Sequence, residues 1–418
     1  MKIVSPLTPQ PLRLVNSIQH YSWGMRGESA FIPKLLGIPA EPDTAYAELW
    51  MGAHPGAPSQ VLLGNSQIPL TELIRQHPQE ILGLQVVSHF GKQLPFLFKI
   101  LSAGEVLSIQ VHPDKKQAIA LHQSDPKHYP DETHKPEIAI ALDELTALVG
   151  FKDTIGTLAA LKDYPEITDF IGNETVSSFQ SKPDGTKARQ RFFSAFFRFS
   201  IKKRDELQNS IDRLERRLLS LPAPTEAESL FLELRKKYPG PDIGLFGLFF
   251  LNLIHLKTGE AIFLPAGVPH AYVHGNIIEC MANSDNVVRA GLTPKFQDIP
   301  TLIDILDYSG ENLTILTDDE NAERLVYATA ADEFVVQRYR LSVKKPMLIQ
   351  KFQTPEILIC VEGEADLIYP VDGSTQTIRL RAGESVLVPA ISEHYELKTE
   401  ERAVVFSAST PYRFTPQS

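Results

Sequence analysis

The chain has 418 residues, of which 43% are hydrophobic and 22% charged, so it is long enough for two or three domains, and disorder is excluded as its dominant state. Its net charge of −10 leaves no overall basic field to hold nucleic acid or an anionic membrane, and its two cysteines cannot build a disulfide framework. We expect a cytoplasmic protein, because no apolar run is long enough to cross a membrane and Pro6 interrupts the N-terminus before a signal peptide could form.

The first third of the chain is predicted to consist of short strands. Apolar residues alternate with polar ones from residue 107 to residue 112, which places Ser108, Gln110 and His112 on one face of a strand. Frequent prolines punctuate other short apolar runs in this region, as expected of strands joined by tight turns.

The middle of the chain, from residue 154 to about residue 240, changes to a helical period. Leucine and isoleucine recur at spacings of four and three from Leu207 to Leu221, between charged residues, which predicts an amphipathic helix. Thr225 and Glu228 have the spacing of a capping box, so a second helix is expected to follow and to run to about residue 238.

Strands return after residue 240. A short helix is predicted at residues 300–306, and an acidic linker at residues 318–320 leads into a last strand-rich block. Within that block, Ala365–Tyr369 and Thr377–Leu380 flank Asp372 and Gly373, a dipeptide typical of the turn of a β-hairpin.

An internal repeat links the two strand-rich regions. Residues 259–270 (GEAIFLPAGVPH) and 383–394 (GESVLVPAISEH) align without gaps, and each combines a glycine turn, a buried strand, a proline turn and a histidine. Two β-domains of the same architecture explain the repeat. The predicted divisions are a catalytic β-domain in two parts (1–153 and 240–317), a helical insertion (154–239) and a C-terminal β-domain (318–418).

Two motifs resemble those of the cupin jelly roll. The pattern GxxxxxQxH that ends at His112 is similar to the first cupin motif with glutamine in place of a histidine, and residues 259–270 are similar to the second. The expected fold class is therefore mainly β, with two cupin-type jelly-roll domains and an α-helical domain. Gln110 and His112 would lie about 7 Å apart along their strand, His270 follows a tight turn, and Glu137 is the candidate fourth ligand. Imidazole with oxygen ligands suits zinc, and also iron or manganese.

The resemblance extends to one family. Residues 19–24 (QHYSWG), 47–59 (AELWMGAHPGAPS), 94–115 (LPFLFKILSAGEVLSIQVHPDK), 134–137 (HKPE) and 264–296 (LPAGVPHAYVHGNIIECMANSDNVVRAGLTPKF) are similar to blocks of type I mannose-6-phosphate isomerases. This resemblance implies an active-site arginine at Arg289. It also implies one zinc ion per chain, held by Gln110, His112, Glu137 and His270.

The reaction that the resemblance implies interconverts mannose 6-phosphate and fructose 6-phosphate. It needs an open-chain sugar, a proton moved between C2 and C1, and stabilisation of an enediolate, for which zinc and the fixed charge of Arg289 are suited. The proton carrier stays open among Lys135, Glu279, Asp285, His134 and Tyr272. The candidates for phosphate binding are Ser108, Lys295 and Lys99. Tyr272, Trp23 and Glu48 are expected to line or support the pocket, with core packing an equal explanation for Trp23.

Other functions compete with this interpretation. An iron-dependent cupin oxygenase could use the same histidines, but the neutral amide of Gln110 is a poor electron donor for oxygen activation. A non-catalytic sugar-phosphate sensor would not need a complete ligand set, and a bifunctional isomerase–nucleotidyltransferase is disfavoured because no glycine-rich phosphate loop precedes a helix. We expect sugar phosphates as partners, in mannose metabolism and GDP-mannose biosynthesis, with no nucleic acid, membrane or obligatory protein partner. The C-terminal repeat lacks a Gln-x-His pair, which predicts a structural role.

Overall fold

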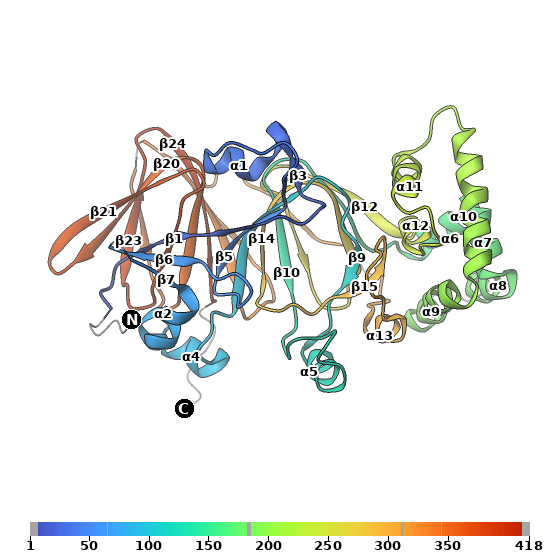
Figure 1. The fold of residues 1–418 in the computed structure, drawn as a ribbon, viewed down its shortest axis with the longest axis horizontal. Coiled ribbons are helices and arrows are strands. Elements are labelled where there is room, and N and C mark those ends of the chain that lie inside the picture. Colours follow the sequence, from blue (N-terminus) through green and yellow to red (C-terminus); the bar gives the residue numbers. More distant parts are fainter. Residues whose placement is uncertain (1–6, 65, 182–184, 311–312, 344, 412–418) are drawn as a thin grey trace.

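The computed structural model describes residues 7–64, 66–181, 185–310, 313–343 and 345–411, so Pro6 lies outside the described residues. Figure 1 shows an elongated molecule in which the C-terminal strands lie at one end, a second group of strands lies in the middle, and a group of helices lies at the other end. Among the described residues, no helix is long and apolar enough to cross a membrane.

The first large sheet is built mostly from the C-terminal quarter of the chain. Its strands are β1 (Leu12–Val15), β6 (Gln60–Leu63), β7 (Ser66–Pro69), β17 (Arg324–Tyr327), β18 (Val335–Ser342), β19 (Met347–Gln350), β20 (Glu356–Val371), β21 (Ser374–Arg381), β22 (Ser385–Val388), β23 (His394–Lys398) and β24 (Arg402–Ser409). Its main path runs β17-β18-β24-β20-β22-β1-β6-β7. The predicted hairpin is confirmed, since β20 and β21 flank Asp372 and Gly373, whose φ angles of 48° and 75° are those of a tight hairpin turn.

Three of these strands come from the N-terminal part of the chain. β1 pairs with β22 through Leu12 opposite Leu387, and β6 and β7 extend the sheet beyond β1. All three lie within residues 1–153, which the prediction assigned entirely to the catalytic β-domain. The reason is packing: Leu12 and Leu14 are buried in an apolar cluster shared with the C-terminal strands, and the pairing of segments so distant in sequence leaves no periodic signal in either one.

The second large sheet carries the candidate ligands. Its strands are β2 (Ser17–Gln19), β5 (Glu48–Gly52), β8 (Phe96–Ala103), β9 (Ile109–Val111), β10 (Glu137–Ala141), β11 (Leu145–Phe151), β12 (Leu251–Leu256), β13 (Ala261–Leu264), β14 (His270–Ala282), β15 (Val288–Gly291) and β16 (Ile315–Leu316). The main path is β16-β13-β10-β14-β8-β5-β2. The C-terminal half of β14 pairs with β10 and β8 while its N-terminal half pairs with β11 and β9, so this one strand joins the two sides of the domain. A short ribbon, β3 (Met25–Arg26) with β4 (Ala45–Tyr46), lies apart.

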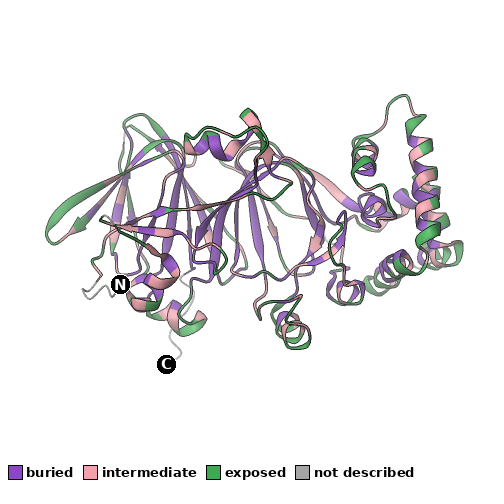
Figure 2. Ribbon diagram, in the orientation of Figure 1, coloured by how far each residue is buried: buried purple, intermediate pink, exposed green. Residues whose placement is uncertain are grey.

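The helices gather mainly in the predicted insertion. Those of the insertion are α6 (Thr154–Asp163), α7 (Pro165–Ile171), α8 (Asn173–Ser181), α9 (Thr186–Lys202), α10 (Arg204–Leu219) and α11 (Glu226–Lys237), and α12 (Gly244–Gly247) follows it. The amphipathic prediction is confirmed in α10, where Leu207, Ile211, Leu214 and Leu218 are buried, and Figure 2 shows the exposed opposite faces of these helices. The capping box before α11 is confirmed. The remaining helices are η1 (Gly27–Ser29), α1 (Phe31–Leu36), α2 (Leu70–Gln76), α3 (Pro78–Leu82), α4 (Leu84–Phe90), α5 (Lys115–Ser124) and the predicted α13 (Ile299–Ile305).

Apolar clusters connect these parts. One cluster joins the helices to β9 and β15 through Phe192, Phe246 and Val111. Another joins the catalytic strands to the C-terminal domain, since Ile138 of β10 and Phe406 of β24 belong to it. The antiparallel sheets and the helical region confirm the mainly β fold class. The two clusters pack the ligand-bearing strands against the helices on one side and against the C-terminal strands on the other.

Candidate metal centre and active site

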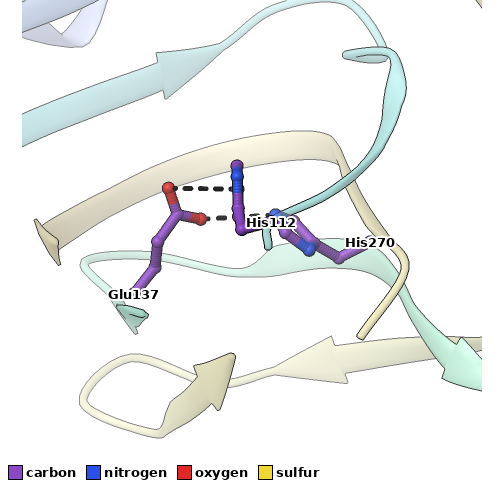
Figure 3. Close-up of side chains that lie close together, drawn as sticks. All are labelled: His112, Glu137 and His270. Atoms are coloured by element: carbon purple, nitrogen blue, oxygen red, sulfur yellow. Dashed lines mark ion pairs between the residues drawn. The ribbon is translucent and has the colours of Figure 1, made fainter. Parts of the chain in front are cut away.

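Three predicted ligands converge where β9, β10 and β14 meet. One ligand atom each from His112, Glu137 and His270 lies within 4.8 Å of the others, and each of the three side chains is 1% exposed. Nε2 of His112 lies 3.5 Å from Oε1 of Glu137, and Nε2 of His270 lies 3.3 Å from its Oε2. Figure 3 shows both imidazole rings beside this carboxylate.

The protonation of the two rings is set by their backbone partners. Nδ1 of His112 lies 2.8 Å from the carbonyl oxygen of Asn286, and Nδ1 of His270 lies 3.0 Å from that of Val268. A carbonyl only accepts, so both Nδ1 atoms carry a proton, and Nε2 of each ring is the nitrogen that faces the cluster. Burial lowers the pKa of His112 to about 4, so the ring is neutral at pH 7, which is the form that binds metal.

The cluster has the features of a cation site. Among the described residues, Nε2 of His112 and Oε2 of Glu137 have no hydrogen-bond partner, although both are buried. Burial raises the pKa of Glu137, but the positive charge of Lys135 and the contacts with the two imidazole rings outweigh this effect, and the pKa of Glu137 lies well below its usual value. A metal ion bound at the cluster explains why these two buried atoms have no hydrogen-bond partner, and zinc suits a ligand set of two imidazoles and a carboxylate.

Gln110 and Arg289 flank the cluster from neighbouring strands. Gln110 of β9 lies opposite His270 of β14 on one side and opposite Arg289 of β15 on the other, and such cross-strand neighbours share one face of a sheet. Nε2 of Gln110 is 3.3 Å from Nε2 of His270, so the amide group reaches the cluster. Arg289 is partly buried and forms no hydrogen bond or ion pair with any described residue. Its charge is therefore available to a ligand.

Lys99, Glu48, Glu279 and Tyr272 form a buried polar network. Nζ of Lys99 lies 2.5 Å from Oε2 of Glu279 and 3.3 Å from Oε1 of Glu48, and the Tyr272 hydroxyl donates to Oε1 of Glu279 over 2.9 Å. Burial raises the pKa of Glu279; for Lys99 the two carboxylates outweigh burial and raise its pKa. Because Lys99 neutralises two carboxylates inside the domain, the geometry does not support it as a phosphate ligand.

The other candidate proton carriers lie in different surroundings. Nζ of Lys135 is 3.1 Å from Oε1 of Glu137, which places the ammonium group at the cluster. Nε2 of His134 is 2.8 Å from Oε1 of Glu333 and is therefore engaged outside the cluster. The side chain of Asp285 is 56% exposed and lies 3.3 Å from Nε2 of His54, which lowers the pKa of Asp285.

The structure places the remaining predicted residues farther apart. Ser108 is half-buried and immediately precedes β9, and half-buried Trp23 stacks on Tyr21 with ring centres 5.8 Å apart. Lys295 is exposed and lines a cleft between the helical region and the segment after β15, together with Arg204 and Lys237. That cleft contains none of the four predicted metal ligands.

Sequence reasoning missed several supporting residues. Asn286 lies inside the quoted block 264–296, and its amide donates to the backbone carbonyl groups of Asp131 and Thr133, which fixes the approach to Glu137. Asn286 lies three residues before the predicted Arg289, so its position in this block could have indicated a role at the site. His54 lies inside the quoted block 47–59, so the same kind of signal was available for it. Glu333 acts through a partner far away in sequence, and no local pattern could have indicated it.

Comparisons with known proteins show the family of this chain. Residues 12–154 match the family model for the phosphomannose isomerase type I catalytic domain. Mannose-6-phosphate isomerase of Schizosaccharomyces pombe is 39% identical over 374 residues (85% of this chain and 89% of the relative), and that of Homo sapiens is 37% identical over 415 residues (94% and 96%). The crystal structure of the Salmonella typhimurium mannose 6-phosphate isomerase bound to fructose 6-phosphate and zinc superposes with a TM-score of 0.80 at 31% identity, covering 95% of this chain and 98% of that one.

Proposed function

This chain belongs to the type I phosphomannose isomerase family, and we propose that it is a zinc-dependent aldose–ketose isomerase that interconverts mannose 6-phosphate and fructose 6-phosphate. The observation that carries the proposal is the convergence of two imidazoles and a carboxylate with unpartnered buried atoms, in a chain whose relatives carry this activity by name.

Each ligand has a defined place in the metal site. We assign one zinc ion per chain to Gln110, His112, Glu137 and His270, with Gln110 contributing its amide oxygen. When bound, zinc supplies Lewis-acid polarisation of the sugar oxygens. The backbone carbonyl groups that hold Nδ1 of each histidine keep both rings oriented for this purpose.

Arg289 is assigned to the charge that develops during the reaction. Its guanidinium group shares the sheet face of Gln110 and lacks a partner among the described residues, so it can stabilise an enediolate without first breaking an ion pair. The charge persists through the pH range of the reaction, because a guanidinium group is not deprotonated in proteins.

Lys135 and Glu279 are the favoured proton carriers. Lys135 contacts the ligand Glu137, and Glu279 is buried with a raised pKa that suits a general acid or base. His134 is disfavoured because Nε2 is bound to Glu333, and Asp285 because it is exposed beside His54. Tyr272 and Glu48 support Glu279 through the network around Lys99.

Ser108 and Lys295 are assigned to the substrate phosphate; Lys295 lines the cleft that the helical insertion borders. Trp23 and its stacked partner Tyr21 are assigned to the wall of the site, because the pKa of Tyr21 is raised by burial and by the nearby charge of Glu48.

The wider assignments rest on composition and family. We infer a cytoplasmic enzyme of mannose metabolism that supplies GDP-mannose biosynthesis and needs no protein partner. For the domain division we keep a catalytic β-domain in two parts, a helical insertion at 154–239 and a C-terminal β-domain, with one change from the sequence expectation: β1, β6 and β7 join the C-terminal domain, because they extend its sheet.

The test combines metal analysis with a coupled isomerase assay. We expect one zinc per chain, turnover of mannose 6-phosphate, loss of turnover after chelation and recovery with zinc. Zinc binding without isomerisation would support a sugar-phosphate sensor instead. Oxygen consumption with iron, and no isomerisation with zinc, would support the oxygenase and contradict the proposal.

A further inference from the structure

The segment that leads into β10 depends on side chains for its position. Residues 131–136 form no helix or strand, yet they carry Lys135 to the cluster, directly after His134. On one side, Ser284 Oγ and Asn286 Nδ2 donate to the carbonyl oxygen of Thr133 over 2.9 and 3.0 Å. On the other side, Nε2 of His134 is bound over 2.8 Å to Oε1 of Glu333, which belongs to the C-terminal domain.

Glu333 is itself held firmly. It is 3% exposed and directly precedes Phe334, which is completely buried. Phe334 belongs to the same apolar cluster as Ile138 and Ile140 of β10, the strand that begins with Glu137. The backbone that carries the Glu333 carboxylate is therefore fixed by the packing of Phe334. Phe334 packs in the same cluster as β10, the strand that follows the segment held by Glu333.

We propose that Glu333 is a positioning residue for the isomerisation, and that the C-terminal domain takes part in catalysis through it. Glu333 does not touch the cluster; it acts by holding His134, and with it the adjacent Lys135. This inference rests on the proposed function, in which Lys135 works at the metal centre, and it departs from the expectation that the C-terminal domain is only structural.

The size of the effect follows from the geometry of the chain. Nζ of Lys135 is 3.1 Å from Oε1 of Glu137, and its backbone is directly bonded to that of His134. If His134 loses its acceptor, the segment stays held at Asp131, Thr133 and Pro136, but the stretch between Thr133 and Pro136 loses its contact with the C-terminal domain and can shift. A misplacement of about 1 Å in a reacting group lowers the rate on the order of 100-fold.

The experiment compares three variants of the full-length, zinc-loaded enzyme. Glu333→Met removes the acceptor but fills a similar volume, whereas Glu333→Gln keeps an oxygen at Oε1 that accepts from His134. Tyr327→Phe is the matched control: its hydroxyl donates over 2.8 Å from the C-terminal domain to the carbonyl oxygen of Gly259, away from His134. Zinc content, thermal unfolding and steady-state kinetics are measured for each.

We expect Glu333→Met to lower kcat at least tenfold with KM changed less than threefold and zinc content at one per chain. Glu333→Gln should keep kcat within about threefold of the parent, and Tyr327→Phe within about twofold. If Glu333→Met does not fold, Glu333→Gln is compared with Glu333→Asp, whose shorter side chain withdraws the acceptor, and Glu333→Asp should be the slower of the two.

Several outcomes would overturn the inference. Full activity in Glu333→Met, or in Glu333→Asp where that variant replaces it, would show that the contact does not position Lys135. A Glu333→Gln enzyme as slow as the Met or Asp variant would show that the charge, not the hydrogen bond, matters. An equal loss in Tyr327→Phe would indicate general loosening between domains. An inactive parent enzyme would instead contradict the proposed function, so the two failures are distinguishable.

Discussion

Replacing Lys99 by methionine tests how the polar network beside the metal centre is stabilised. The side chain of Lys99 is 7% exposed, and those of its partners Glu279 and Glu48 are 3% and 8% exposed. Methionine keeps a similar length but leaves two buried carboxylates without a cation. Removing one partner of a buried ion pair costs about 3–5 kcal/mol, and we expect a loss of unfolding free energy in that range.

Both tryptophans of the chain report on this region. Trp50 lies opposite Lys99 on the neighbouring strand and donates to Glu48, and Trp23 contacts a neighbouring apolar cluster. Urea unfolding followed by tryptophan fluorescence therefore monitors the stability of the catalytic β-domain. Lys237→Met is the matched control, because Lys237 also pairs with a carboxylate, over 2.6 Å, but its side chain is 39% exposed.

The unfolding free energies of the Lys99 and Lys237 variants test whether burial makes the Lys99 ion pairs important for stability. Lys237→Met should cost less than about 1 kcal/mol, as expected of a surface ion pair. The combined Lys99→Met and Glu279→Gln variant should recover part of the lost unfolding free energy. Glutamine at position 279 removes one of the two carboxylates that Lys99→Met leaves without a cation. A Lys99→Met protein as stable as the Lys237→Met control would refute the view that the network is held together by its charges.

Further predictions concern the metal centre and the substrate. Arg289→Ala should lower kcat about 100- to 1,000-fold, because it removes a fixed charge beside the developing enediolate. Lys295→Ala should mainly raise KM. Steady-state kinetics, with zinc content checked in both variants, would contradict the assignment if Arg289→Ala changed only KM and Lys295→Ala lowered kcat. His270→Ala should reduce zinc to well below one per chain while circular dichroism stays close to that of the parent, and stoichiometric zinc in this variant would contradict the ligand assignment.

The local elements of this fold could be predicted because their signals lie within a few residues. The spacing of Leu207 and Ile211 determines which face of α10 is buried, and Asp372-Gly373 favours the turn between β20 and β21. The addition of β1 to the C-terminal sheet could not be predicted, since Leu12 lies opposite Leu387 across almost the whole chain.

The candidate site shows the same division. Residue types and short spacings indicated His112 and His270, which the structure brings together. The same reasoning offered Lys99 as a phosphate ligand, because a lysine in a matched block carries no sign of the carboxylates that it will meet on other strands. Glu333 had no signal at all, since its role depends on a contact with His134 across 199 residues.

The C-terminal repeat keeps three ligand types of the catalytic copy in matching register. Gln350 of β19 lies opposite His394 of β23, as Gln110 lies opposite His270. Likewise, Glu356 begins β20 opposite Val388, and Glu137 begins β10 opposite Leu264; the repeat aligns Val388 with Leu264. The position two residues after Gln350 holds phenylalanine, where the catalytic copy has His112.

These residues nevertheless do not form a second metal site. Ile349 and Tyr395 lie opposite each other and are 3% and 0% exposed, so they face the interior, and their neighbours Gln350 and His394 face away from it. Inside, the ammonium group of Lys351 lies 3.1 Å from the Glu356 carboxylate and provides the positive charge that a metal would bring.

His394→Ala should therefore leave the enzyme almost unchanged. The residue is only partly buried and lies on the outer face of its strand, so we expect kcat within about twofold of the parent and a change in unfolding free energy of no more than about 0.5 kcal/mol. Zinc content should stay at one per chain, because all the zinc belongs to the catalytic copy. Two results would contradict this: a second zinc in the parent enzyme that is lost in His394→Ala, or a strong fall in kcat at unchanged stability. Either result would show that the repeat has kept a working site, although Gln350 and His394 face away from the interior.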